Sequence, residues 1–410
     1  MITHGQDTAI LRDLVCRYAQ VAADDVQDRR RLRWRSLNSL APVAPPIYVR
    51  GGNCWDEVPE INDRRCQDPL LAGLERQVRR LLYRTGLNDD SVFEPWLRIG
   101  AVHRTGGWGL EPTRVAPAEP GGAWKHDPPI REPEDIRKLV MPRHEIDEAA
   151  TAERAARARE AVGDILPIHV DRGPTWRMWS ADLSTDLGQL RGIETFMLDM
   201  MDRPEWLHEL MAFLRNGVLA AHQQAEDAGD WSLAEHENQA FVYSRELPDP
   251  APNSYGAKRS RLWGYAAAQE FTLVSPAMHE EFLLSYQRPI LEKFGLVAYG
   301  CCEDLTRKID MLRSVPNLRR IAVAPRADVA KCAEQIGGDY VMSYRPNPAE
   351  MVCCGFDAHR IRRIVRRDLA ICRGLCVDIT LKDAETVEHQ PQRLRDWTRI
   401  VREVAERYTS

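Results

Sequence analysis

The sequence predicts an α/β protein whose parallel strands close into a (β/α)8 barrel. The chain has 410 residues, a length that one large barrel domain can accommodate. Its second half alternates short apolar runs with amphipathic helical stretches, a pattern typical of parallel strands joined by crossover helices. A doubly wound sheet is the alternative, but no Gly-x-Gly-x-x-Gly motif follows any of the runs, which disfavours nucleotide binding.

The N-terminal residues 1–44 are predicted to form a helical extension. Apolar side chains recur every three or four residues over 7–36, as on one face of a helix. Pro45 and Pro46 end this pattern, and residues 47–50 read as a buried strand that runs into a glycine loop. A second amphipathic helix is expected over 68–86.

Residues 95–130 are dense in Pro, Gly and Trp and predict an irregular segment or hairpin over the barrel mouth. Helices are expected at 133–139 and 146–162, with Asp147 capping the second. After a strand at 165–170, two helices are expected within 190–228. Asp202 is expected to cap the second of these, with Pro204 in its first turn.

The alternation in the second half then supplies most of the barrel. Together with the upstream strands, its strands approach the eight that a barrel needs, and no linker interrupts the chain, so we predict a single domain over 1–410. Strands are expected at 262–268, 296–300, 318–324, 339–344 and 375–381, and helices at 276–294, 304–314, 326–336 and 357–373.

Composition excludes several function classes. The net charge of −5 argues against binding to a nucleic-acid backbone, which needs a basic surface. No apolar run is long enough to span a membrane, and the first residues do not resemble a secretory signal. Ten cysteines without a C-x-x-C pair argue against zinc ribbons and indicate a reducing, cytoplasmic location.

The carboxyl ends of barrel strands surround the active site, which ranks the candidate residues. The most informative segment is 299–305, where two cysteines and two carboxylates stand between a strand and the next expected helix. A helix N-terminus favours the thiolate form of cysteine, which binds zinc or attacks an electrophile. Packing of one cysteine in the core is the alternative.

Several motifs, taken in order, resemble the uroporphyrinogen decarboxylase-like superfamily, over roughly residues 45–405. They are Leu190–Glu194 with Asp202–Leu207, Ala268–Glu270, Ser275–Pro276, Tyr299–Cys301 and Arg345–Pro348. The resemblance implies a (β/α)8 barrel. It also implies one of two activities, porphyrinogen decarboxylation or methyl transfer to or from a corrinoid protein.

The resemblance is closer to the methyltransferases. True decarboxylases have a longer arginine-rich signature at the first strand, where this sequence keeps only Arg50. The methyltransferases hold zinc with a His-x-Cys motif and a later cysteine. Cys301 matches the first of these cysteines, Tyr299 stands at the histidine position, and Lys382-Asp383 ends the last strand without a cysteine.

We therefore expect a methyltransferase that moves a methyl group between a small ether, amine or thiol and a corrinoid carried by a separate protein. The alternatives are a decarboxylase of a small carboxylated substrate or of uroporphyrinogen, and a non-catalytic ligand-binding barrel. The sequence leaves the oligomeric state open, and a homodimer is one alternative. The expected catalytic residues are Glu270, Asp383, Lys382 and Arg50; the expected substrate contacts are Trp55, Trp108, His169, Arg172 and Tyr299; and the expected zinc ligands are Cys301, Cys302, Glu303 and His236, with Glu270 or His169 as substitutes.

Overall fold

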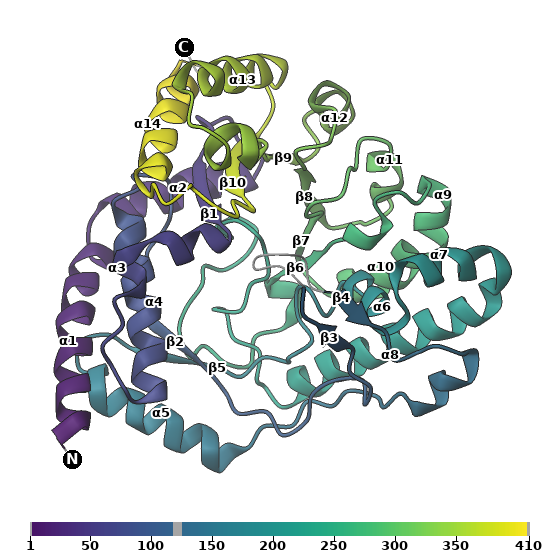
Figure 1. The fold of residues 1–410 in the computed structure, drawn as a ribbon, viewed down its shortest axis with the longest axis horizontal. Helices are drawn as coiled ribbons and strands as arrows, with labels where there is room; N and C mark the ends of the chain where they lie inside the picture. The colour runs from purple at the N-terminus through teal and green to yellow at the C-terminus, as the bar shows by residue number, and fades with distance from the viewer. Residues whose placement is uncertain (1, 118–124, 408–410) are drawn as a thin grey trace.

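The fold is a mixed α/β architecture whose largest sheet has six parallel strands. It is seen in a computed structural model that describes residues 2–117 and 125–407 (Figure 1). The six strands follow the spatial order β1-β10-β9-β8-β7-β6, a second sheet pairs β2 with β5 in parallel, and β3 and β4 form an antiparallel hairpin. The strands are β1 Ile47–Gly51, β2 Leu97–Gly100, β3 Thr113–Val115, β4 Lys125–Asp127, β5 Ile168–Asp171, β6 Trp263–Ala266, β7 Leu296–Tyr299, β8 Leu318–Val323, β9 Val341–Tyr344 and β10 Val377–Lys382.

Helices lie around the outside of these strands (Figure 1). Because the strands are covered on both sides, β6, β7, β9 and β10 are buried along their whole lengths. The helices are α1 Ile2–Ala22, α2 Val26–Asn38, α3 Pro59–Asn62, α4 Pro69–Thr85, α5 Glu148–Val162, α6 Ser184–Arg191, α7 Ile193–Asp202, α8 Pro204–Asp227, α9 Pro276–His279, α10 Ser285–Leu291, α11 Ile309–Leu312, α12 Val329–Ile336, α13 Ala358–Ile371 and α14 Gln392–Glu406.

At the outer edges of β1 and β5, side chains accept hydrogen bonds from backbone N–H groups that a neighbouring strand would otherwise accept. The carboxylates of Asp89 and Asp90 accept hydrogen bonds from the backbone N–H groups of Val49 and Ile47 on β1. The side-chain oxygen of Asn253 accepts the N–H group of Val170 on β5. The backbone groups at both edges therefore find partners without a further paired strand.

The expected strands of the second half are confirmed as β6 to β10, and the helix of 146–162 is confirmed as α5. Asp147 caps α5, because its carboxylate accepts the N–H of Ala150. The hairpin expected within 95–130 is present as β3 and β4, although the part of that prediction over 118–124 lies outside the described residues. The same segment contains a further short strand, β2, which pairs with β5.

Other boundaries differ from the expectations. The helix expected over 7–36 is two helices, α1 and α2. Asp202 ends α7 and does not cap α8, which Arg203 precedes. The helix expected at 304–314 shrinks to the four residues of α11, and a π-helical turn at Glu280–Leu284 divides the one expected at 276–294. Within the described ranges, no helix combines the length and the apolar character that crossing a membrane requires.

Candidate active site

A cavity of about 450 Å³ lies where β1, β7 and β10 end. We call it the Cys301 cavity. It collects six of the site residues expected at strand ends, and helices α4 and α6 complete its wall. Its lining consists of Arg50, Gly51, Gly52, Arg80, Trp179, Thr185, Gln269, Glu270, Cys301, Cys302, Lys382 and Asp383.

The loop after β7 holds Cys301 in a fixed position. Gly300 has a φ of 101°, and a Cβ atom there would lie 2.7 Å from the Leu305 side chain, so only glycine fits this turn. The buried carboxylate of Glu303 accepts the N–H groups of Cys301 and Ala268, each at 2.8 Å. Arg345 donates a hydrogen bond to the carbonyl oxygen of Cys301. These contacts fix the backbone beneath the thiol group.

The surroundings of Cys301 favour the thiolate form of its side chain. Its Sγ atom lies 3.3 Å from the Sγ atom of Cys302 and accepts a hydrogen bond of 2.8 Å from Nζ of Lys382. The hydrogen bond from Cys302 and the positive charges of Lys382 and Arg345 lower the pKa of Cys301 to about 5, although burial opposes the shift. The same pairing raises the pKa of Cys302, which favours the negative charge on Cys301.

The buried Lys382 and the exposed Asp383 complete a group of charges beside the two sulfur atoms. Nζ of Lys382 lies 2.7 Å from the Asp383 carboxylate, which also accepts the Cys302 thiol at 3.0 Å. Burial alone would lower the pKa of Lys382, but the negative charges of Cys301 and Asp383 contribute to raising it. Asp383 has a φ of 56°, a left-handed conformation that is unfavourable for a non-glycine residue and is common at functional positions.

The remaining wall of the cavity mixes basic and acidic side chains. Glu270, on a short turn after β6, accepts a hydrogen bond from the Ser184 hydroxyl. Arg80 projects from α4 over the ring of Trp55, with 5.1 Å between its guanidinium carbon and the ring centroid. The sequence analysis did not identify Arg80, because its position within an amphipathic helix carries no local signal of a site.

Two expected substrate contacts, Trp55 and Tyr299, lie behind the lining of the Cys301 cavity. Trp55 is buried, and its indole N–H donates to the carbonyl oxygen of Arg50, so the ring supports the cavity wall from behind. The Tyr299 hydroxyl donates to Gln287 and contacts His279, which places it among the helices outside the sheet. Neither residue lines the Cys301 cavity.

Trp108 lies in a second cavity of about 510 Å³, which we call the Trp108 cavity. Its indole N–H donates a hydrogen bond of 2.7 Å to Asp186, and its ring packs edge-on against Trp176. Burial raises the pKa of Asp186 to about 7. Because Thr185 lines the Cys301 cavity and Asp186 lines the Trp108 cavity, α6 separates the two.

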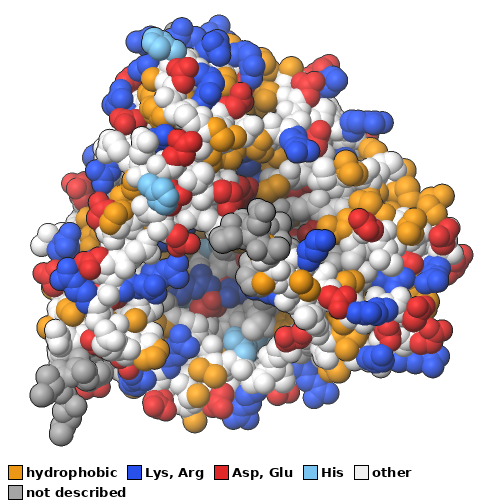
Figure 2. All heavy atoms as spheres, viewed as in Figure 1, with side chains coloured by type: hydrophobic (Ala, Val, Ile, Leu, Met, Phe, Trp, Pro, Cys, Tyr) orange, Lys and Arg blue, Asp and Glu red, His pale blue; other side chains and the backbone are white. Residues whose placement is uncertain are grey.

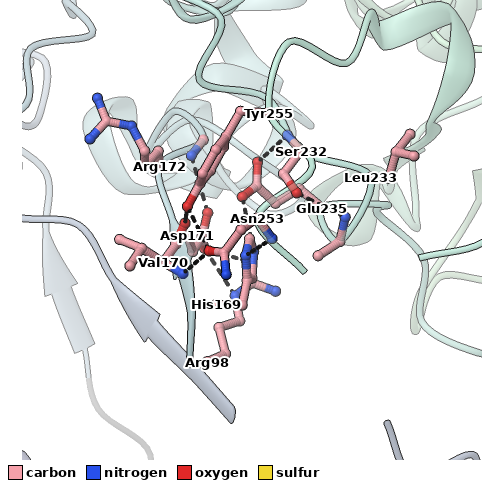
Figure 3. A network of polar contacts seen from close by, with 12 residues as sticks. Arg98, His169, Val170, Asp171, Arg172, Ser232, Leu233, Glu235, Asn253 and Tyr255 are labelled. Atoms are coloured by element: carbon pink, nitrogen blue, oxygen red, sulfur yellow. Dashed lines mark hydrogen bonds and ion pairs between the residues drawn. The ribbon is translucent and has the colours of Figure 1, made fainter. Parts of the chain in front are cut away.

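His169 and Arg172 belong to a polar network at the end of β5 (Figure 3). Nδ1 of His169 accepts the backbone N–H of Asn253, so Nε2 is the protonated nitrogen, and it faces Glu235 at 3.4 Å. Arg172 pairs with Asp230 and Glu148. Both expected substrate contacts are therefore engaged within this network, and neither residue lines the Cys301 cavity.

Figure 2 shows a hollow near the middle of the face of the molecule drawn there, with basic and acidic side chains on its floor.

The four expected zinc ligands do not come together. Cys301 and Cys302 are adjacent, but the Glu303 carboxylate is engaged by two backbone N–H groups. Nδ1 of His236 accepts the N–H of Trp263 at the start of β6, whereas Cys301 follows the end of the neighbouring strand β7, so His236 lies at the opposite end of the sheet. Within 2–117 and 125–407, no three His, Cys, Asp or Glu side chains are grouped as a metal site. The four residues expected as zinc ligands therefore do not share one site.

The thiolate also has a different cause from the expected one. No helix begins at residue 304, since α11 starts at Ile309, so a helix N-terminus does not stabilise the Cys301 thiolate. Lys382 and Cys302 provide that stabilisation.

When the sequence is compared with protein-family models and with curated proteins, neither comparison yields a match.

Proposed function

We propose that the protein is an enzyme that transfers a methyl group from a small methylated substrate to a corrinoid carried by another protein. The observation that carries the proposal is the set of contacts that joins Lys382 to Cys301 and Asp383 on the wall of a 450 Å³ cavity. A cavity of this size accommodates a small molecule, and strongly perturbed pKa values within a cavity are typical of catalytic sites. The resemblance in motif order supports methyl transfer as the reaction.

Loss of a methyl group from an ether, amine or thiol leaves a basic anion on the substrate, an alkoxide, amide or thiolate, that must be neutralised. The Lys382 ammonium group is suited to this because Cys301 and Asp383 keep it charged and hold it in place. Its positive charge stabilises the developing anion in a site of low dielectric constant, and Nζ then gives a proton to the leaving atom. Glu270 lies on the same cavity and is the second candidate donor.

The other residues of the cavity bind and orient the substrate. Arg50 and Arg80 offer two guanidinium groups, which favour a methylated substrate that also carries a carboxylate or phosphate. When the carrier protein is bound, its corrinoid supplies the cobalt that accepts the methyl group.

The experiment is a methyl-transfer assay with methylated ethers, amines and thiols that bear a carboxylate, in the presence of a corrinoid protein or free cobalamin. We expect the demethylated product with the wild type, an approximately 100-fold slower reaction with Lys382→Met, and partial activity with Lys382→Arg, which keeps the charge. The proposal is wrong if the wild type produces no more demethylated product than Lys382→Met across the panel.

A second candidate is a decarboxylase, which the joint placement of Arg50, Arg80 and Lys382 on one cavity favours. The two arginines would bind the carboxylate, and Lys382 or Asp383 would deliver a proton to the carbon that loses CO₂. Release of CO₂ from a small carboxylated substrate without corrinoid would identify this reaction. Arg172 has no part in it, because it is paired with Asp230 and Glu148 at the end of β5.

We also propose that the two parallel sheets are parts of one (β/α)8 barrel in a single domain. The six strands of the larger sheet and the two strands β2 and β5 together give the eight strands that such a barrel requires. Their order along the chain is the order in which they would follow one another around a closed barrel. The side chains of Asp89, Asp90 and Asn253 then replace the missing ladder hydrogen bonds at the two gaps between the sheets.

The thiolate of Cys301 supports a cytoplasmic location, where thiols stay reduced.

A further inference from the structure

Cys301 and Cys302 place two sulfur atoms 3.3 Å apart on the wall of the Cys301 cavity. The Cys301 side chain is buried within the wall, whereas Cys302 is exposed. Proton transfer from Lys382 needs only one of the two sulfurs as an anionic neighbour. The second sulfur is therefore unexplained by the reaction proposed above.

We propose that Cys301 and Cys302 are a modification site for small hydroperoxides, which oxidise the pair reversibly to a disulfide between adjacent residues. The Cys301 thiolate attacks one peroxide oxygen, the O–O bond breaks, and the departing hydroxide or alkoxide takes a proton from solvent. Cys301 is then a sulfenic acid. The Cys302 sulfur attacks the Cys301 sulfur, the S–O bond breaks, and the hydroxyl group leaves as water with the Cys302 proton. The dithiol loses two electrons and the peroxide gains them.

The surroundings of the pair favour each step. Lys382, 2.8 Å from Sγ of Cys301, stabilises the attacking thiolate, which is the reactive form of cysteine. The low pKa of Cys301, about 5, agrees with this placement. A disulfide bond is about 2.04 Å long, so the two sulfurs need to approach by little more than ~1 Å. The cavity gives a small peroxide a route to the pair.

The geometry also makes the disulfide easy to reduce. Adjacent Cα atoms are about 3.8 Å apart, which is shorter than the separation of roughly 4.4–6.8 Å in ordinary disulfides. Strained disulfides have more oxidising potentials and are the labile ones. Oxidation removes the thiolate and leaves Asp383 as the anionic partner of Lys382. The pair can be oxidised whichever reaction the cavity performs.

The chain contains a matched control, the adjacent cysteines Cys353 and Cys354. Cys353 is buried and Cys354 is exposed, as in the first pair. However, burial raises the pKa of Cys353, and the negative charge of Glu385 raises it further. The control pair therefore shares the sequence spacing and the exposure pattern but not the stabilised thiolate.

The test treats the full-length protein with hydrogen peroxide at neutral pH, blocks the remaining thiols and compares the two cysteine pairs by mass spectrometry. We expect the Cys301–Cys302 peptide to lose two hydrogens about tenfold faster than the Cys353–Cys354 peptide, and dithiothreitol to restore it. In Cys302→Ser, oxidation should stop at a sulfenic acid on Cys301 that dimedone traps.

Two results would overturn the proposal. One is equal oxidation of the two pairs in the wild type. The other is accumulation of a sulfinic acid on Cys301 that dithiothreitol does not reverse. Both are read from the wild-type protein, so neither depends on a variant that folds poorly, and neither bears on methyl transfer or decarboxylation.

Discussion

Nζ of Lys382 lies 2.8 Å from Sγ of Cys301, although 81 positions separate the two residues in the chain. The end of β10 carries the lysine and the end of β7 carries the cysteine, and both side chains are almost fully buried. An ammonium group and a thiolate held this close stabilise each other, because the surrounding protein screens their charges weakly.

Lys382→Met is expected to raise the pKa of Cys301 from about 5, because the cation that stabilises the thiolate is lost. The rate of alkylation of Cys301 by iodoacetamide, measured as a function of pH, reports this pKa. Lys382→Arg retains the positive charge and should shift the pKa much less. An unchanged pH profile in Lys382→Met would mean that Cys302 and Arg345 set the acidity of Cys301 without Lys382.

The thiolate also makes folding stability depend on pH. The folded-state pKa of Cys301, about 5, lies below its ordinary value of 9.0, so its stabilising contribution is complete above pH 9 and disappears as the pH falls through 5. We therefore expect the difference in Tm between the wild type and Cys301→Ala to grow as the pH rises from 5 to 9 in the presence of reductant. A constant or shrinking difference would contradict a thiolate at this position.

Asp186 has the opposite effect. Burial raises its pKa from 3.8 to about 7, so the folded state keeps a proton that the unfolded chain loses, and stability falls as the pH rises from about 4 to 7. Asp186→Asn removes this penalty and can still accept the Trp108 hydrogen bond. Its Tm at pH 8 should exceed that of the wild type, with a smaller difference at pH 4, whereas Asp186→Ala, which lacks the acceptor, should show less of this gain.

A buried ion pair anchors α6 to α7. The Arg191 guanidinium binds both carboxylate oxygens of Asp199, at 2.6 and 3.0 Å, and also donates to the carbonyl oxygens of residues 130 and 131. Asp199→Ala leaves the arginine charge buried without its partner and should lower the free energy of unfolding by about 3–5 kcal/mol. Urea denaturation measures the loss. The exposed Asp202 at the end of α7 is the matched control, and Asp202→Ala should change stability by less than about 0.5 kcal/mol.

The strand-end rule was the most successful inference from sequence. It placed Arg50, Glu270, Cys301, Cys302, Lys382 and Asp383 near one another, and the structure brings all six to the same cavity. The rule works because parallel strands have a common direction, so that their last residues meet at one edge of the sheet whatever their separation in sequence.

The rule does not say which face of a strand a side chain occupies. Strand β7 is buried on both faces, so its sequence shows no alternation of polar and apolar residues. Tyr299 was therefore expected in the cavity, but its hydroxyl points to Gln287 and His279 among the helices. Arg80 and Thr185 reach the cavity from helices, where nothing in the local spacing distinguishes them from surface residues.

The position of His236 could not be predicted from the sequence either. The segment that contains it is neither helix nor strand, and it delivers the imidazole to the first residue of β6, at the end of the sheet remote from Cys301. Periodicity identifies regular elements, but the path of an irregular segment depends on tertiary contacts.

The arrangement of α6 has a consequence for ligands. Thr185 and Asp186 are consecutive residues of one helical turn, but Thr185 lines the Cys301 cavity and Asp186 lines the Trp108 cavity. This single turn of α6 is therefore the wall that the two cavities share. A molecule that shifts this partition from one side alters the shape offered on the other. Binding in the two chambers is then thermodynamically linked, and each occupant changes the affinity of the other by the same factor.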